Sequence, residues 1–121
     1  MSTRIRRGDI FTYDLDIPPL GSRVMADPHP VIVVQCDEGN AHSSLTTFAV
    51  GTSTINRVFS WDCILETGEG GLANRTRICC NQLHTVEQSE LLEVNRIGRI
   101  PASKIPALNK ALKYALQLPN Y

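Results

Sequence analysis

Two hydrophobic periodicities divide the chain, and each is confined to its own region. Through roughly the first hundred residues, apolar side chains occur in short alternating or β-branched runs such as Ile10–Leu15 and Val31–Val34, separated by polar or glycine-rich stretches. A helical spacing follows only near the end, where one helix face would carry Ile105, Leu108, Leu112, Ala115 and Leu116. This order predicts an α+β chain that is mainly β, with a small, strongly curved antiparallel sheet or barrel and a C-terminal α-helix.

The other predicted strands are Leu45–Val50, Val58–Leu65, Arg77–Leu83 and Glu93–Ile100. Asp16–Pro30 is rich in proline and is predicted to be a long loop of the kind that often carries function. Asp37–Asn40 consists of turn residues. Ser103 is expected to cap the terminal helix, with Pro106 in its first turn and Pro119 as its stop.

Composition and charge exclude some classes of partner. Lys and Arg number 12 among 121 residues, and Asp and Glu also number 12, so the formal net charge is zero. That balance excludes a uniformly basic nucleic-acid coat but allows a local basic groove. No apolar run approaches the roughly 20 residues of a membrane span, and the basic start is not followed by the apolar stretch of a signal peptide. We therefore expect one domain over residues 1–121, in the cytoplasm and not in a membrane.

The four cysteines, Cys36, Cys63, Cys79 and Cys80, contain no C-x-x-C pair. In a cytoplasmic chain they are expected to be thiols, and their spacing resembles no common zinc site. Cys79 and Cys80 would point to opposite faces of a strand and so could not easily share one metal. Buried structural thiols are expected, and no metal site.

Four polar residues are candidates for chemistry on their placement alone. His29 lies between two prolines just before a β-branched strand, so its backbone is extended and stiff. A histidine held in that way can serve as a general acid or base, and the alternative is a solvent-facing loop histidine. Thr52 and Ser53 follow a strand, where hydroxyls can donate to a phosphate oxygen or simply cap a turn. His84 is expected near the start of a turn or short helix, in a structural role.

An ordered series of short motifs resembles one known family. From the N-terminus these motifs are Arg7-Gly8-Asp9-Ile10, Gly21-Ser22, His29-Pro30-Val31-Ile32-Val33-Val34-Gln35, Gly39-Asn40, Gly51-Thr52 and Cys80-Asn81-Gln82-Leu83-His84-Thr85-Val86. Their order and spacing are similar to those of the MazF/PemK toxin endoribonucleases. The resemblance covers nearly the whole chain, from Arg6 to Leu118.

The resemblance implies an SH3-like barrel that forms a homodimer and binds single-stranded RNA, with mRNA as the expected class. It implies sequence-specific cleavage without a metal or other cofactor. The ribose 2′-hydroxyl attacks the adjacent phosphate, which leaves a 2′,3′-cyclic phosphate and a 5′-hydroxyl. Such chemistry needs a base, an acid and donors that stabilise the charge on phosphorus. It also implies an antitoxin protein whose acidic tail would occupy the same groove as the RNA.

The chain departs from the family pattern at four polar positions. His29 stands where the family has an arginine, Arg23 where it has a glutamate, Asn81 where it has an aspartate, and His84 where it has a further arginine. An imidazole can carry out both proton transfers, but it lacks the permanent charge and the bidentate phosphate grip of arginine.

Two hypotheses follow from these departures. In the first, catalysis has been redistributed: His29 and His84 transfer protons, Thr52 and Arg23 stabilise the phosphate, and the RNA is bound by Ser22, Arg23, Ser53, Asn81 and Gln82. In the second, the chain is a catalytically inactive RNA- or antitoxin-binding module of the same fold. A topoisomerase poison is a third possibility, because related barrels act in that way, but the ribonuclease-like order of motifs argues against it.

Overall fold

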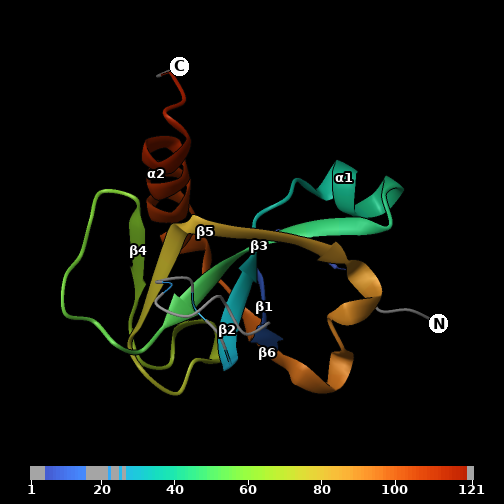
Figure 1. Ribbon diagram of the computed structural model, residues 1–121, viewed down its shortest axis with the longest axis horizontal. Helices are drawn as coiled ribbons and strands as arrows, with labels where there is room; N and C mark the ends of the chain where they lie inside the picture. Colours follow the sequence, from blue (N-terminus) through green and yellow to red (C-terminus); the bar gives the residue numbers. More distant parts are fainter. Residues whose placement is uncertain (1–4, 16–21, 23–24, 26, 120–121) are drawn as a thin grey trace.

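The computed structural model describes residues 5–15, 22, 25 and 27–119 (Figure 1). Its described part contains an antiparallel sheet with the strand order β4-β5-β3-β2-β1-β6. The strands are β1 (Asp9–Leu15), β2 (Asp27–Val33), β3 (Leu45–Thr52), β4 (Asp62–Leu65), β5 (Thr76–Glu87) and β6 (Arg96–Arg99). The α-helices are α1 (Asp37–His42) and α2 (Ile105–Leu116), and short 3-10 turns are η1 (Glu69–Gly71), η2 (Gln88–Glu90), η3 (Glu93–Asn95) and η4 (Ala102–Lys104).

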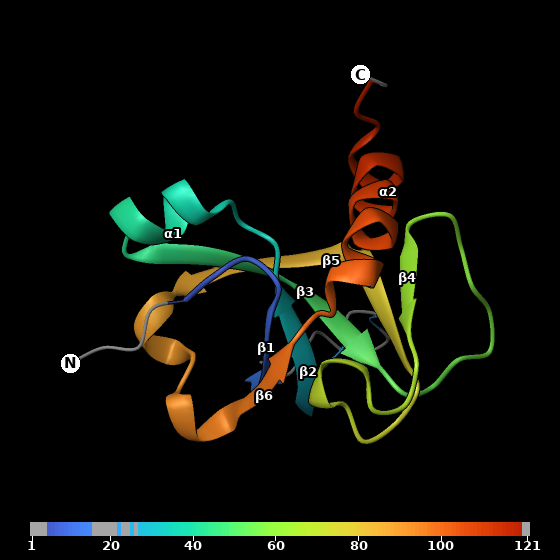
Figure 2. The ribbon, with the colours of Figure 1, turned by 180° about the vertical axis from the view of Figure 1, so that it is seen from behind.

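Apolar side chains are buried on both faces of the sheet. One cluster includes Ile32, Ile78 and Cys80 and packs under Leu108 and Leu112 of α2. The other includes Val31, Val33 and Phe48. Alternate residues of the β-branched run therefore belong to different clusters, which confirms the prediction that this strand is buried on both faces. Figure 2 shows α2 standing beside β4 and β5, and contacts join it to both strands.

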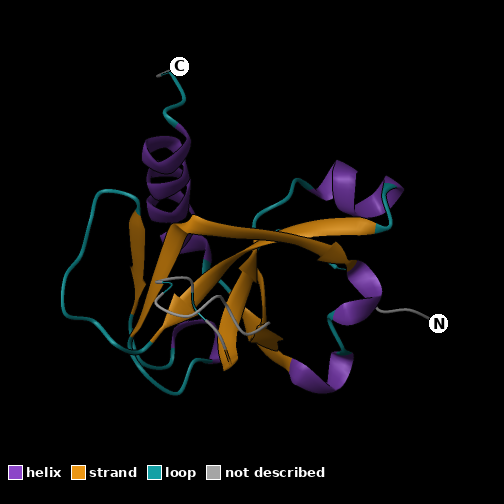
Figure 3. Cartoon of the chain, viewed as in Figure 1, coloured by secondary structure: helices purple, strands orange, loops and turns teal. Residues whose placement is uncertain are grey.

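The two ends of the sheet approach each other through glycines. A Cβ added to Gly98 of β6 would run into the carbonyl oxygen of Gly70 in η1, the turn that follows β4. Gly70 itself has a φ of 63°, in the left-handed region that favours glycine. This close approach joins the two ends of a six-stranded sheet that is curled into a half-barrel (Figure 3). The expected strongly curved antiparallel sheet with a C-terminal helix is therefore confirmed.

Several predicted boundaries were wrong, each for a local reason. Asp37–Asn40 begins a helix instead of a turn, because Cys36 caps it: its Sγ accepts the backbone N–H of Gly39 at 3.4 Å. The predicted strand Val58–Leu65 begins only at Asp62. The last strand shrinks to Arg96–Arg99 because Glu93–Asn95 forms a 3-10 turn.

Other corrections concern β2, β5 and α2. Residues 27–30, predicted to end a loop, belong to β2 and pair with β1. β5 continues to Glu87, so His84 lies within a strand and not at a turn. Lys104, and not Ser103, precedes α2, and Gln117 ends it in a left-handed conformation.

All four cysteines are free thiols. Cys79 and Cys80 are buried, as expected, and so is Cys63, whereas Cys36 is exposed. Burial raises the pKa of Cys63 and of Cys79 to about 11 and that of Cys80 to about 12. These three are unreactive core residues at neutral pH. Neither helix in the described ranges has the length and apolarity that crossing a bilayer demands.

Candidate functional site

A side chain replaces a missing backbone hydrogen bond where β2 and β3 part. Val34 N donates to Thr47 O, and in an antiparallel ladder every second pair is bonded in this way. Continuing the register Ile32↔Ala49 by two residues places position 30 opposite Gly51. Pro30 has no N–H to donate. The carbonyl oxygen of Gly51 is instead 2.9 Å from Nδ1 of His29.

This contact fixes the tautomer of the neutral imidazole. A carbonyl oxygen only accepts, so Nδ1 of His29 must carry the hydrogen in the bond to Gly51. In the neutral ring, Nε2 then holds a lone pair and can accept a proton. The half-buried His29 is therefore an oriented base and not a freely rotating loop residue.

His29 shares a cavity of about 300 Å³ with the hydroxyl residues that end β3. Its lining includes Thr52, Ser53 and Thr54, together with Asn74 and Thr76. The Thr52 hydroxyl oxygen accepts the backbone N–H of Thr54 at 3.1 Å, which leaves the hydroxyl hydrogen able to donate to a ligand. The structure thus brings together three of the residues singled out from the sequence.

An arginine that the sequence did not single out lies across from Thr52. β3 and β5 pair Thr52 with Arg77, and directly opposed residues project to the same face with Cβ atoms roughly 5 Å apart. The Arg77 side chain is 20% exposed, and its guanidinium is 3.3 Å from Asp62, whose side chain is fully buried. Arg77 Nε has no hydrogen-bond partner. Only the pairing register reveals this residue, and no local motif could have found it.

The structure does not bring His84 to this cavity. His84 pairs with Phe48, and the two rings stack with centroids 5.6 Å apart. Phe48 is four residues from Thr52 along β3, which is a separation of roughly 13 Å. The proposed proton-transfer pair of His29 and His84 therefore does not form within one chain.

Asn81 and Gln82 lie in a bulge of β5. Ala49 pairs with Leu83 but its neighbour Val50 pairs with Cys79, so residues 80–82 have no partner on β3. Asn81 is exposed, and Gln82 accepts the backbone N–H of Met25 at 3.0 Å. Ser22 is exposed. Arg23, expected to contact phosphate, lies outside the described residues.

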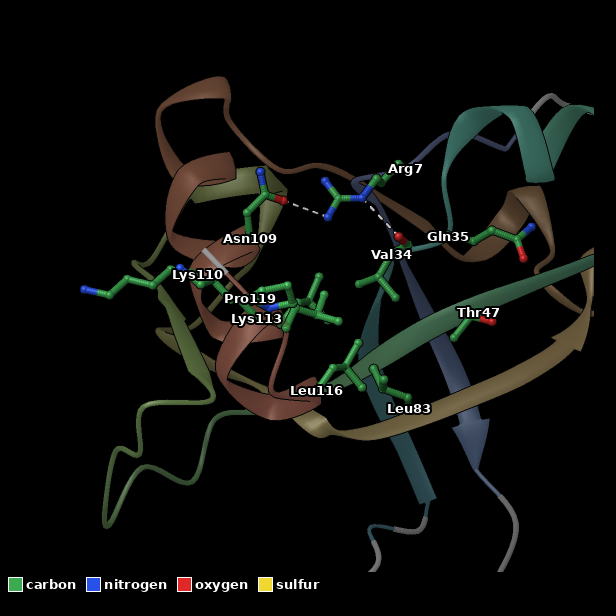
Figure 4. A pocket seen from close by; sticks show the side chains of 12 residues that line it. Arg7, Val34, Gln35, Thr47, Leu83, Asn109, Lys110, Lys113, Leu116 and Pro119 are labelled. Atoms are coloured by element: carbon green, nitrogen blue, oxygen red, sulfur yellow. Dashed lines mark hydrogen bonds between the residues drawn. The ribbon is translucent and has the colours of Figure 1, made fainter. Parts of the chain in front are cut away.

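A larger, mostly apolar cavity of about 760 Å³ lies elsewhere, between α2 and the sheet (Figure 4). Val34, Leu83 and Leu116 line it, with Lys110 and Lys113 at its edge. Arg7 spans one side, donating through Nε to Val34 O at 3.0 Å and through a terminal nitrogen to Asn109 Oδ1 at 2.7 Å. Its lining includes none of the candidate catalytic residues His29, Thr52 and His84.

Comparison with known proteins shows the family of the chain. The model of the PemK-like, MazF-like toxin of type II toxin–antitoxin systems matches residues 6–116. The endoribonuclease MazF9 of Mycobacterium tuberculosis is 31% identical over 119 residues, covering 94% of this chain and 98% of that protein. The chain belongs to the PemK/MazF toxin family. The Staphylococcus epidermidis endoribonuclease MazF is 28% identical over 118 residues, covering 97% and 95% of the two chains.

Solved PemK/MazF structures share the fold. A mycobacterial endoribonuclease superposes with a TM-score of 0.76 at 18% identity, covering 98% of this chain and 97% of that one. The M. tuberculosis toxin MazF-mt6 gives 0.74 at 23% identity, covering 93% and 99%. The resemblance inferred from the motifs is confirmed, and with it the assignment of the chain as a MazF-type endoribonuclease toxin.

Proposed function

We propose that this toxin cleaves single-stranded RNA by attack of the ribose 2′-hydroxyl on the adjacent phosphate, without a metal or other cofactor. The observation that carries the proposal is the bond between His29 Nδ1 and Gly51 O, because it presents Nε2 as a base beside Thr52. DNA lacks the 2′-hydroxyl and could not react in this way.

The described site supplies the base and the donors that stabilise the phosphate, and solvent supplies the acid. His29 Nε2 takes the proton of the 2′-hydroxyl as its oxygen bonds to phosphorus. Thr52 donates to a non-bridging phosphate oxygen, and Arg77 adds a permanent positive charge on the same face. The bond from phosphorus to the 5′ oxygen then breaks, and that oxygen takes a proton from water. His29 returns its proton to solvent.

The remaining residues are assigned to binding. Ser53 is exposed and lines the cavity, and Asn81 and Gln82 lie at the bulge beside the β1–β2 connection. Ser22 and Arg23 belong to that connection and complete the proposed RNA contacts. His84 is left with a packing role against Phe48.

The test is end-mapping of mixed single-stranded RNA incubated with pure protein in EDTA. We expect fragments with 5′-hydroxyl and 2′,3′-cyclic phosphate ends, lost in His29→Ala and retained in His84→Ala. Cleavage that persists in His29→Ala would mean that a group other than His29 is the general base. Intact RNA with the wild-type protein would instead favour the inactive binding module, for which the loss of the family arginine at position 29 is the supporting observation.

An antitoxin and a second copy of the chain are the proposed protein partners, in the cytoplasm where RNA and antitoxin occur. One solved mycobacterial relative, with a TM-score of 0.76, is an endoribonuclease in complex with its cognate antitoxin. The apolar surface of Figure 4 supports the homodimer, because Leu116 and Leu118 are 52% and 45% exposed there. Light scattering should give twice the 13.4 kDa chain mass, and Leu116→Glu should give the single chain.

A further inference from the structure

The loop between β3 and β4 carries a stack of three flat side chains. The rings of Phe59 and Trp61 are 4.6 Å apart and nearly parallel, at 4°. The guanidinium of Arg57 lies over the ring of Phe59, 4.8 Å from its centroid. Neither aromatic residue belongs to a core cluster of the sheet. Two of the largest side chains of the protein are therefore held outside the core.

A buried carboxylate holds this loop in place. Asp62 accepts the backbone N–H of Phe59 at 2.8 Å, and its own N–H donates to Phe59 O at 3.0 Å. Asp62 is in turn paired with Arg77. The Trp61 carbonyl accepts the N–H of Cys80 at 3.1 Å, which ties the loop to the bulge of β5. The stack is thus prearranged, and binding a ligand would not have to order it.

Positive charge and a further aromatic ring lie beside the stack. Phe59 lines a cavity of about 290 Å³ together with Lys110 and Tyr114 of α2. Tyr114 is 56% exposed. Within the described ranges, no carboxylate pairs with Arg57 or Lys110. Both cations are therefore available to a ligand that brings its own negative charge.

We infer that Arg57, Phe59 and Trp61, with Lys110 and Tyr114, form a stacking subsite for nucleotides of single-stranded RNA. Flat rings suit bases of any sequence, an arginine over a ring adds cation–π attraction, and lysine suits the phosphates between them. The loop leaves the reaction cavity at Ser53 and Thr54 and ends beside α2 (Figures 1 and 2). An RNA strand that leaves the reaction cavity along this loop would reach the stack. The inference rests on the proposed function and extends it to nucleotides beyond the cleaved bond.

Trp61 is the only tryptophan and reports directly on this subsite. The experiment titrates the protein with 2′-O-methyl RNA oligonucleotides, which cannot be cleaved by 2′-hydroxyl attack, and follows Trp61 fluorescence. We expect saturable quenching, with roughly tenfold weaker binding in Arg57→Gln and in Phe59→Leu. Arg75→Gln is the matched control, because Arg75 is also exposed but is paired with Glu66. Arg57→Gln alters only an exposed side chain, so it remains informative if Phe59→Leu fails to fold.

The outcomes separate this inference from the proposed function. Unchanged Trp61 fluorescence at saturating oligonucleotide, with both variants binding and cleaving like wild type, would overturn the stacking subsite alone. Quenching by an acidic peptide but not by the oligonucleotide would also overturn it, in favour of a protein ligand. A wild-type protein that neither cleaves RNA nor binds the oligonucleotide would overturn both proposals.

Discussion

Nδ1 of His29 lies 2.9 Å from the carbonyl oxygen of Gly51, at the place where a backbone N–H of β2 would bond if residue 30 were not proline. The proline thus does more than stiffen the chain before a strand. Because it donates nothing to β3, it leaves an acceptor that only the neighbouring side chain can satisfy. The orientation of the proposed base, His29, follows from this missing backbone hydrogen bond between β2 and β3.

Pro30→Ala should therefore weaken catalysis without unfolding the protein. The new N–H can bond to Gly51 O and release His29, so we expect roughly tenfold slower cleavage at an unchanged melting temperature. Cleavage of a short RNA reporter and the imidazole NMR signals of His29 measure the effect. Pro28→Ala is the control, since the same register extended further places position 28 opposite Ser53, beyond the end of β3. Equal slowing in both variants would count against this account.

Arg77 should contribute to the rate more than to RNA binding. Removing one charge-stabilising donor typically costs about 10² in kcat, so Arg77→Gln should lower kcat by that order with a small change in KM. Arg77→Lys keeps the positive charge but loses the planar guanidinium that Asp62 holds in place, so it should recover only part of the rate. Arg75→Gln, an exposed arginine two residues away, should behave like wild type. Equal rates for all variants would remove Arg77 from the mechanism.

Gly98→Ala should push β6 away from η1 and so destabilise the curled sheet. Its Cβ would meet the Gly70 backbone, which cannot move aside as a flexible side chain would. We expect a loss of about 3 kcal/mol in the free energy of unfolding, measured in urea. Gly68→Ala is the comparison, because Gly68 has a φ of 89° but open space around it. That variant should lose only about 1 kcal/mol, from backbone strain alone.

The buried thiols should make the fold sensitive to alkaline pH. Burial raises the pKa of Cys63 and Cys79 from 9.0 to about 11 and that of Cys80 to about 12. Above pH 9 the unfolded chain therefore loses these protons first, and stability falls as the pH rises toward 11 to 12. Urea unfolding at pH 8 and pH 10.5 measures this loss. Cys80→Ala should reduce the loss, whereas Cys36→Ser should leave it unchanged.

Thiol modification gives an independent check of burial. At pH 8 one thiol per native chain should react, that of the exposed Cys36, and all four should react in denaturant. More than one fast-reacting thiol in the native protein would contradict the packing of β4 against β5.

The local pattern of apolar and polar residues predicted most of the strands. It failed where a side chain forms a hydrogen bond with a nearby backbone N–H. Phe59 and Trp61 alternate as in a strand, but Asp62 accepts the Phe59 N–H that a strand would use in its ladder. At the start of α1, the Cys36 thiol accepts the Gly39 N–H and caps a helix where the residue types predicted a turn. Such side-chain hydrogen bonds depend on which partner is nearest in space, and the alternation of residue types does not encode that.

The sequence by itself determined the fold class and the family, and it singled out His29 and Thr52 as candidate site residues, because periodicity, proline and motif order act over short stretches of chain. Tertiary structure decided which polar groups share a site. It placed Arg77 opposite Thr52, separated His84 from His29, and directed the His29 ring to Gly51. Each of these relations depends on the register between strands that are distant in sequence, and the bulge at residues 80–82 changes that register within β5 itself. Register is fixed by the packing of the whole sheet, and no single segment carries it.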